Sequence, residues 1–161
     1  MNKDYWKNIC LGRVLTEEFI EANKLYVNWT MISRYQKLSE NFIQKFIDQV
    51  NLPSILRSQK LSEDFIERYK DRFDVSDWKL VSKYQKLSEN FIKKYSLELY
   101  WPFISRYQKL TETFILEQQD KLNWKAIFDK YTLSKKTLTL LVNKEWDNDR
   151  IKRIYIQQLS T

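Results

Sequence analysis

The stretch Trp29–Ile43 reads WTMISRYQKLSENFI, and it returns almost unchanged twice later in the chain. The second copy, Trp78–Ile92, reads WKLVSKYQKLSENFI, and the third, Trp101–Ile115, reads WPFISRYQKLTETFI. A segment that recurs at a fixed period is the signature of a repeat protein, in which each unit buries its apolar face against its neighbours. The repeat is therefore the unit from which we expect the fold to be built.

Three weaker copies extend the array: Trp6–Ile20, Leu52–Ile66, where Leu replaces the Trp anchor, and Trp124–Leu138, which is degenerate after Ile127. The repeats therefore start near residues 6, 29, 52, 78, 101 and 124, which are 23, 23, 26, 23 and 23 residues apart. Trp146 follows at a spacing of 22, and it indicates a C-terminal cap over about residues 146–161.

The single spacing of 26 residues falls around Asp71–Ser76. Three extra residues at this point predict a bulged loop or a change of superhelical direction. The other spacings are regular enough to predict that every repeat has the same internal structure.

Capping residues predict two short helices in each repeat. The residue before the anchor is a good N-cap in four repeats, because its side chain accepts from free backbone N–H groups: Asn28, Asn51, Asp77 and Asn123. The second helix has N-caps in all six repeats: Thr16, Ser39, Ser62, Ser88, Thr111 and Ser134. An apolar residue before many of these caps can pack on another at the fourth helical position, as Leu38 can on Ile43, and close a hydrophobic staple. Glu at the first position of the second helix complements the helix dipole.

The apolar spacing agrees with two packed helices. Trp29, Ile32 and Tyr35 lie at i, i+3 and i+6, and Phe42, Ile43 and a following aromatic form a second apolar face. Such short helices are unstable alone and must pack on neighbouring repeats. The sequence predicts an all-α fold, a right- or left-handed αα solenoid of about six 23-residue two-helix repeats plus a terminal cap, as a single domain over residues 1–161.

Composition supports this fold class. The 161 residues include 1 Gly and 2 Pro, too few for the many turns of a β-sandwich, while 43% are apolar, too many for a disordered chain. One Cys excludes an internal disulfide and fits a reducing compartment. The sequence lacks an apolar run long enough for a membrane span and lacks a signal-peptide hydrophobic region at its start. We expect a protein of the cytoplasm, that of the host cell if it is of phage or viral origin.

The unit resembles short repeats of the type Trp-x-x-Ile-Ser-x-Tyr-Gln-Lys-Leu-Ser-Glu-x-Phe-Ile that occur in proteins of phages, low-GC bacteria and giant viruses. The residues that carry the resemblance are Trp29–Ile43, Trp78–Ile92 and Trp101–Ile115, and with the weaker copies it covers about Trp6–Leu138. The last copy departs most, with Lys135, Lys136 and Thr137 in place of Glu, a variable residue and Phe. The resemblance implies the repeat fold and no particular activity.

The residue inventory argues against an enzyme. The chain has no His, one Gly and one Cys, so it lacks the commonest general base, a phosphate-binding glycine loop and a Cys/His zinc site. Cys10 aligns with Ser33, Ser82 and Ser105, which favours a small structural residue over a nucleophile. The acidic residues favour structural or solvating roles. We predict no catalytic residues, no metal site and no cofactor.

Two aromatic positions recur. The Trp anchors could stack nucleic-acid bases, but their helical period favours a place in the core: Trp6, Trp29, Trp78, Trp101 and Trp124. The second position holds Tyr35, Tyr84 and Tyr107, for which we also favour the core, although Gly12, Ser58 and Lys130 take the place in other copies.

The feature that most suggests a binding function is a polar ladder near the end of each first helix. Equivalent positions of a solenoid line up along one edge, where they could follow a phosphate backbone or an acidic protein surface. The competing interpretation is that these side chains only cap helix carbonyls, copied by duplication. The ladder contains Arg34, Gln36, Lys37, Arg57, Gln59, Lys60, Lys83, Gln85, Lys86, Arg106, Gln108 and Lys109.

These features predict a non-enzymatic module that binds a protein partner. The viral character of the repeat suggests a phage- or virus-encoded inhibitor of a host defence protein. The alternative is a basic solenoid that binds nucleic acid through the ladder, consistent with a net charge of +7, although 21 acidic residues interrupt the basic ones along the chain. If the ladder is not the contact surface, we expect variable second-helix positions such as Gln44, Glu67, Lys93 and Leu116 to be. We expect no membrane binding, and a monomer or a defined dimer because both terminal repeats are atypical.

Overall fold

In a computed structural model, residues 3–141 and 149–160 are described, and every regular element within these ranges is a helix. This confirms the predicted all-α fold class. The chain divides into two compact units, Met1–Lys86 (unit 1) and Leu87–Thr161 (unit 2), which are described separately below. The prediction of a single domain stays a prediction.

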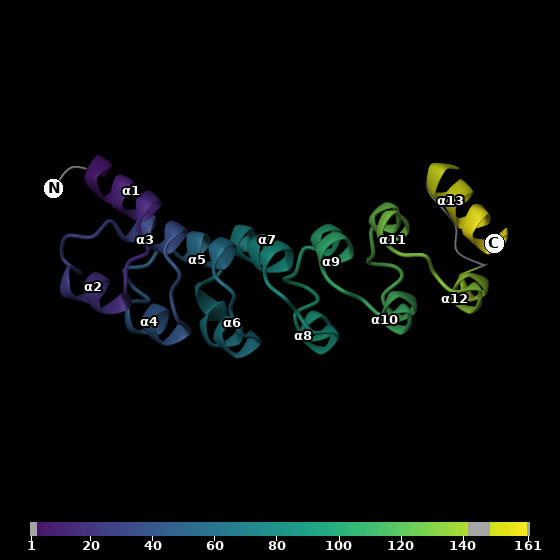
Figure 1. Cartoon of the computed structure of the whole chain (residues 1–161). Helices are drawn as coiled ribbons and strands as arrows, with labels where there is room; N and C mark the ends of the chain where they lie inside the picture. The colour runs from purple at the N-terminus through teal and green to yellow at the C-terminus, as the bar shows by residue number, and fades with distance from the viewer. Residues whose placement is uncertain (1–2, 142–148, 161) are drawn as a thin grey trace. The chain divides into compact units, whose positions relative to one another are not determined.

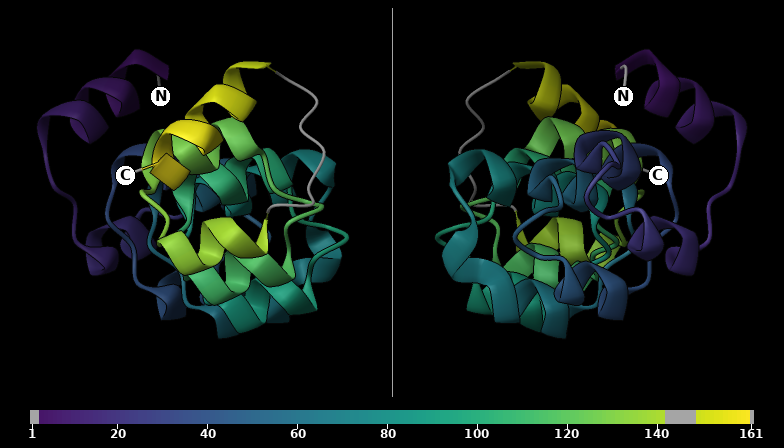
Figure 2. Two further views of the ribbon diagram at one scale, coloured as in Figure 1. Left: turned by 90° about the vertical axis from the view of Figure 1, so that its right-hand side faces the viewer. Right: turned by 90° about the vertical axis from the view of Figure 1, so that its left-hand side faces the viewer.

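Unit 1 contains seven α-helices and one 3₁₀-helix among its described residues. They are α1 (Lys3–Gly12), α2 (Glu17–Ala22), α3 (Trp29–Tyr35), α4 (Glu40–Lys45), α5 (Leu52–Ser58), α6 (Glu63–Tyr69), η1 (Lys70–Arg72) and α7 (Val75–Tyr84). The first helices of successive repeats pack on each other, α1 on α3, α3 on α5 and α5 on α7. Figure 1 shows them as one row and α2, α4 and α6 as a second row, and Figure 2 (right) shows the same unit from its α1 end.

Unit 2 repeats the arrangement. Its described helices are α8 (Glu89–Lys94), α9 (Trp101–Tyr107), α10 (Glu112–Glu117), α11 (Trp124–Lys130), α12 (Lys135–Leu140) and α13 (Asp149–Ser160). Here α9 packs on α11, α10 packs on α12, and α13 packs on both α11 and α12. Each unit is therefore a stack of two-helix repeats, as an αα solenoid requires.

The predicted caps of the second helices are confirmed. Every one of the six Ser or Thr side chains accepts a hydrogen bond from the backbone N–H three residues later, as Ser39 does from Phe42. Asn28, Asn51 and Asn123 cap the first helices of their repeats in the same way. The staple residues are buried as well, for example Leu38 with Ile43. Local chemistry thus fixes where nearly every helix begins.

The prediction that Asp77 is an N-cap is wrong. Helix α7 begins one turn earlier, at Val75, and Asp74 is its N-cap. Asp77 lies at the third helical position, where its carboxylate accepts from the Asp74 N–H to close a capping box. Burial raises the pKa of this carboxyl, with the Asp74 charge adding to the effect and the bond from the Asp74 N–H opposing it.

A serine explains why the repeat spacing changes here. The Ser33 Oγ donates to Trp29 O (2.7 Å) and accepts from Asn51 N (2.9 Å), so it ties the start of α5 to α3. In α5 the equivalent residue is Leu56, which is fully buried and offers no such oxygen. The three extra residues instead give α7 its own cap and a length of 10 residues, against 7 for α5. An additional helical turn, with η1 before it, replaces the predicted bulged loop.

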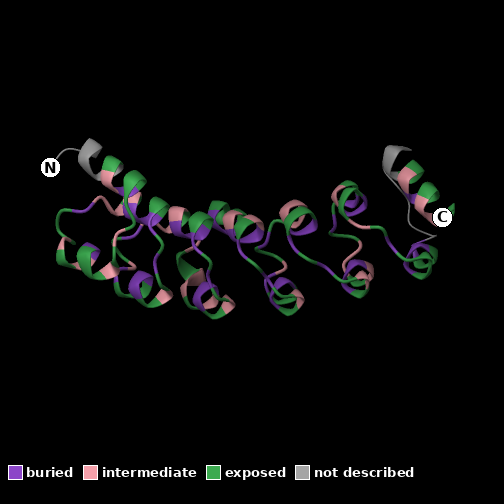
Figure 3. Cartoon of the chain, viewed as in Figure 1, coloured by how far each residue is buried: buried purple, intermediate pink, exposed green. Residues whose placement is uncertain are grey.

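The core lies between the rows of each unit, and the fully buried side chains are mostly the repeated isoleucines, such as Ile32, Ile43 and Ile66. Figure 3 shows that the helices carry buried and exposed sides. Trp78 and Trp124 are buried, whereas Trp29 and Trp101 are half-buried and donate their indole N–H to carbonyls of the preceding loop. The side chain of Trp6 and the whole of Trp146 lie outside the described residues.

The three tyrosines are not in the core. Tyr35, Tyr84 and Tyr107 are 38%, 41% and 44% exposed, so the preference for core placement was wrong. The core stripe of the first helix runs through Trp29, Ile32, Ser33 and the following Gln36, at i, i+3, i+4 and i+7. Residue i+6 lies beside this stripe, and this explains the exposure of Tyr35.

Candidate interaction surface

The glutamines of the predicted ladder are buried, and they join consecutive repeats. Gln36 is 3% exposed; its Oε1 accepts from Leu15 N (2.7 Å) and its Nε2 donates to the carbonyls of Cys10 and Arg13 (both 3.0 Å). Gln59 bonds Leu38 N and Gln36 O in the same way, and Gln85 bonds Leu61 N and Gln59 O. Each amide therefore satisfies the backbone of the preceding repeat where the chain turns between its two helices. We call this arrangement the glutamine clamp.

The clamp continues in unit 2 with other side chains. Gln108 Oε1 accepts from Leu87 N (3.0 Å), and the Tyr131 hydroxyl accepts from Leu110 N (2.9 Å) while donating to Gln108 O (3.1 Å). Gln158, on α13, accepts from Leu133 N and donates to Tyr131 O. The C-terminal helix thus closes the last repeat with the same bonds as a first helix, and the buried Tyr155 anchors it by donating to Leu138 O.

A second contact between repeats also went unpredicted. The Glu40 carboxylate accepts from both the backbone N–H and the hydroxyl of Ser62, the N-cap of the next repeat. Glu17 does the same with Ser39, and Glu112 with Ser134. These bonds, and one from Thr137, lower the pKa of the Glu112 carboxyl. The glutamates that were assigned only to the helix dipole therefore also connect successive N-caps.

The cations of the predicted ladder lie on the surface. We call them, with the three exposed tyrosines, the basic ladder: Arg34, Tyr35, Lys37, Arg57, Lys60, Lys83, Tyr84 and Lys86 in unit 1, and Arg106, Tyr107 and Lys109 in unit 2. Lys83 is half-buried and the other cations are exposed. Arg34 lies over the Tyr35 ring (5.3 Å to the centroid) and Arg57 over the Tyr84 ring (5.5 Å), so tyrosines position the guanidinium groups.

Acidic residues are absent from the sequence around the basic ladder. The eleven-residue segments 29–39, 52–62, 78–88 and 101–111, which span most or all of each first helix and the following turn, contain no Asp or Glu. The acidic residues that interrupt the basic ones along the chain lie instead mostly on the second helices and in the loops that follow. In each unit the two kinds of helix form separate rows, so the charge is segregated in space although it alternates in sequence (Figure 1).

Outside α11, where Lys125 pairs with Asp129, ion pairing follows the same division. Second-helix cations and those of the following loops pair across repeats with carboxylates, Lys45 with Glu21 and Arg72 with Asp48 in unit 1, and Lys93 with Glu117 in unit 2. Among the residues that the structure describes, the arginines of the basic ladder form no ion pair with a carboxylate, and neither do Lys37, Lys60, Lys86 and Lys109. In each unit these arginines and lysines therefore form a positive surface without carboxylate partners among the described residues, and exposed tyrosine rings lie beside it.

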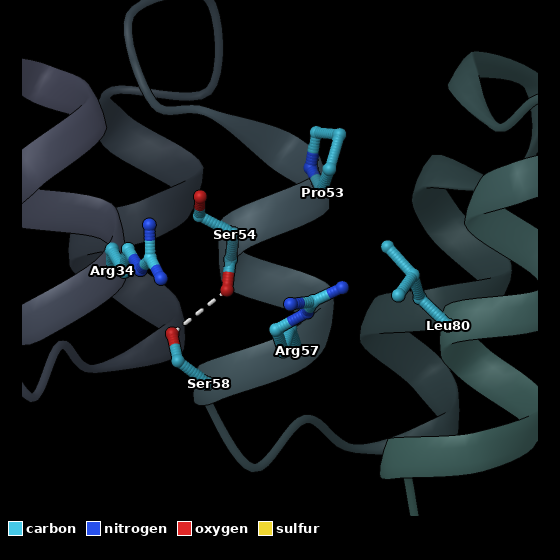
Figure 4. Close-up of a pocket in the computed structure, with 6 residues that line it drawn as sticks. All are labelled: Arg34, Pro53, Ser54, Arg57, Ser58 and Leu80. Carbon is cyan, nitrogen blue, oxygen red and sulfur yellow. Dashed lines mark hydrogen bonds between the residues drawn. The ribbon is translucent and has the colours of Figure 1, made fainter.

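One part of the basic ladder is hollowed. The Arg34–Arg57 groove is a cavity of about 120 Å³, lined by Arg34, Pro53, Ser54, Arg57, Ser58 and Leu80. Figure 4 shows Ser54 and Ser58 on α5 between the two arginines, with Leu80 facing them from α7. The groove exists where Ser58 replaces the tyrosine of other repeats. It is much smaller than the roughly 300–1,000 Å³ of a small-molecule site, so it suits a chemical group more than a whole cofactor.

Unit 2 has a groove at the equivalent position with different chemistry. It is lined by Arg106, Ala126, Asp129 and Lys130, which correspond in the repeat to Arg34, Ser54, Arg57 and Ser58. Asp129 pairs with Lys125 (3.1 Å), and the Lys130 ammonium donates to Gln108 O. The Arg106 groove therefore contains a carboxylate where the Arg34–Arg57 groove has a second guanidinium.

Two other features, a hollow and a buried cysteine, lack the properties of a functional site. A larger hollow of about 370 Å³ lies beside Leu25, Trp29 and Phe46, but its Lys45 is paired with Glu21. Cys10 is buried, and burial raises the pKa of its thiol, which keeps it protonated. Over the described ranges, no group of three or more His, Cys, Asp or Glu side chains could hold a metal ion.

Comparisons of the chain with models of protein families, with curated proteins and with solved structures find no match. None of the helices in residues 3–141 and 149–160 has the length and apolar character needed to cross a bilayer. The basis for a functional proposal is therefore the geometry of the basic ladder itself.

Proposed function

We propose that the protein is a non-enzymatic interaction module that binds an acidic protein surface through its basic ladder. The observation that carries this proposal is the segregation of charge: exposed arginines and lysines without carboxylate partners lie on acid-free segments, beside exposed tyrosines. Arg and Tyr are among the residues that contribute most to protein interfaces. The glutamine clamp holds consecutive repeats together, so the surface is presented by a preorganised scaffold.

The test reverses charge on the basic ladder and leaves the scaffold intact. Lys37→Glu, Lys60→Glu and Lys86→Glu are combined in one variant, because all three side chains are exposed and make no described bonds. The matched control combines Lys24→Glu, Lys135→Glu and Lys136→Glu, which change the net charge equally at exposed positions on or after second helices. The wild type and both variants are each immobilised on a resin and exposed to nuclease-treated host lysate. A protein that is captured is then purified and titrated against the wild type and both variants.

We expect an acidic protein to bind the wild type and the control and to lose at least about tenfold in affinity for the ladder variant. Equal binding by the two variants would exclude the basic ladder as the contact surface and turn attention to second-helix positions such as Gln44 and Lys93. The interpretation as an inhibitor of a host protein stays a prediction.

The segregated charge also favours a second candidate, nucleic-acid binding. In that case the lysines would neutralise phosphates and the exposed tyrosines would stack on bases. Titration of a labelled thymidine oligonucleotide at increasing salt separates the candidates. Nucleic-acid binding requires the logarithm of affinity to fall steeply with the logarithm of salt, by about 0.7 per phosphate neutralised on a single strand. A shallow response would remove this candidate.

A further inference from the structure

We propose that the Arg34–Arg57 groove binds a phosphate monoester on the protein partner, the phosphorylated side chain of a serine, threonine or tyrosine. This inference rests on the proposed function, because it specifies what one part of the basic ladder recognises. It depends on three features of the groove: its two guanidinium groups, its small residues, and the absence of the same chemistry at the equivalent position in unit 2.

The charge of the groove suits a dianion. Its two arginines come from consecutive repeats, and neither has a carboxylate partner among the described residues. Each is held by a tyrosine ring, Arg34 by Tyr35 and Arg57 by Tyr84. A phosphorylated side chain carries about 1.5 to 2 negative charges at pH 7, and the planar guanidinium group matches phosphate oxygens in a bidentate manner. Two guanidinium groups that line one groove carry a double positive charge, which favours a phosphoryl dianion over a single carboxylate.

The lining of the groove also fits the rest of such a side chain. Ser58 leaves open the space that a tyrosine occupies in other repeats. Its hydroxyl is within donating distance of two carbonyl oxygens, Ser33 O (2.9 Å) and Ser54 O (2.8 Å). The Ser54 hydroxyl makes no hydrogen bond among the described residues and can donate to a phosphate oxygen. Pro53 and Leu80 supply an apolar edge for the carbon atoms that carry the phosphate (Figure 4).

The equivalent groove in unit 2 has different chemistry, and this favours a protein phosphate over a nucleic-acid backbone. A phosphate chain would need equivalent sites in successive repeats. In the Arg106 groove of unit 2, Asp129 replaces Arg57 and Ala126 replaces Ser54, so a phosphate there would meet a carboxylate. A groove whose chemistry is not repeated at the equivalent position of unit 2 suits one isolated phosphate.

The test titrates O-phospho-L-serine, inorganic phosphate, L-serine and a ten-residue thymidine oligonucleotide into the whole chain, while NMR follows the arginine Nε–Hε signals. We expect saturable shifts at Arg34 and Arg57 with the two phosphates and none with serine. Arg57→Asp, which copies the residue of unit 2, should weaken phosphoserine binding by at least about tenfold, and Arg57→Gln should do so without adding repulsion. The control Arg153→Asp, which reverses an exposed arginine on α13 outside the basic ladder, should leave the affinity unchanged, and circular dichroism checks that each variant is folded.

Three results would overturn the proposal. Shifts that grow linearly without saturating would show only general attraction of anions. Saturable binding that survives both Arg57 variants would place the phosphate elsewhere. Oligonucleotide binding that shifts Arg34, Arg57 and Arg106 together with a steep salt response would assign the surface to nucleic acid. The proposed function can stand when this test fails, because the lysine variant described above leaves the groove untouched.

Discussion

The Arg34–Arg57 groove and the Arg106 groove occupy the same place in two repeats, yet their charges differ. In both, the first helix spans 7 residues and begins with an asparagine cap. Three substitutions, Ser54 to Ala126, Arg57 to Asp129 and Ser58 to Lys130, separate a doubly basic cleft from one that contains its own carboxylate. The comparison shows that the repeat fixes the position of a surface side chain and leaves its chemistry open to change.

The largest expected effect is the conversion of one groove into the other. Ala126→Ser, Asp129→Arg and Lys130→Ser together give unit 2 the polar lining residues of the Arg34–Arg57 groove. We expect phosphoserine binding at Arg106 to change from undetectable to within about tenfold of that at Arg57, because the new guanidinium supplies the missing bidentate contact.

The measurement for this variant is the same NMR titration, with Asp129→Asn as the control that removes the carboxylate without adding a guanidinium. If the triple variant binds no better than Asp129→Asn, the lining residues do not determine recognition.

The next effect concerns the residues that follow the two grooves in sequence, Gln59 and Tyr131. Gln59→Leu removes the side-chain amide that bonds the buried Leu38 N–H and the Gln36 carbonyl. We expect this substitution to lower the free energy of unfolding by about 2–4 kcal/mol. Tyr131→Phe should cost less, about 1–2 kcal/mol, because Lys130 still donates to Gln108 O and only Leu110 N–H is orphaned.

Urea unfolding of the whole chain measures both losses. Gln49→Leu makes the same substitution at an exposed glutamine and should change the free energy of unfolding by less than about 0.5 kcal/mol. A cost for Gln59→Leu no larger than that of Gln49→Leu would show that the glutamine clamp contributes little to stability.

A smaller effect is expected from closing the Arg34–Arg57 groove. Ser58→Tyr restores the residue of the neighbouring repeats, where it lies exposed and causes no crowding in the core. Phosphoserine affinity should fall by about tenfold because the ring fills the space for the phosphate, while binding through Lys37, Lys60 and Lys86 should persist. Unchanged phosphoserine affinity in the titration would show that the opening at Ser58 is irrelevant.

The smallest effect is a pH dependence. Glu112 accepts from Ser134 and Thr137, and these bonds lower its pKa in the folded state. The stabilisation is fully present above the ordinary glutamate pKa of about 4.3 and is lost as pH falls through the lower folded value. Glu112→Gln should therefore cost less than about 1 kcal/mol at pH 7, and the difference from wild type should shrink below about pH 4. Thermal unfolding at both pH values measures this, and a difference that grows in acid would contradict it.

The sequence predicted those features of the fold that depend on residues close together in the chain. The N-caps and staples of the second helices involve residues three to five positions apart, so residues such as Ser39 and Leu38 suffice to place them. The prediction that Asp77 is an N-cap failed because the start of α7 depends on a contact between repeats. Leu56, at the serine position of the preceding first helix, has no side-chain oxygen that could bond the start of the next helix.

The candidate site was half predicted, for the same reason. Arg34 and Lys37 were placed on the surface correctly, but Gln36 was grouped with them although its bonds are all to the previous repeat. The spacing of Trp29, Ile32, Ser33 and Gln36 could have revealed an inward position, since i, i+3, i+4 and i+7 define one helical face. The acid-free segments were also visible once the repeats were aligned. The groove could not be foreseen, because it depends on how Arg34 and Leu80 meet α5.

The glutamine clamp gives the chain a polarity. Each of these amides bonds backbone groups of the repeat before it. A repeat that has just left the ribosome therefore keeps bare N–H and C=O groups until the next one arrives, whereas loss of an N-terminal repeat exposes only a side-chain amide that water can solvate. Unfolding of single repeats should thus cost more free energy from the C-terminal end of the stack than from the N-terminal end. Gln158 on α13 makes the equivalent bonds for the repeat that contains α11 and α12, so the Leu133 N–H and the Tyr131 carbonyl are satisfied.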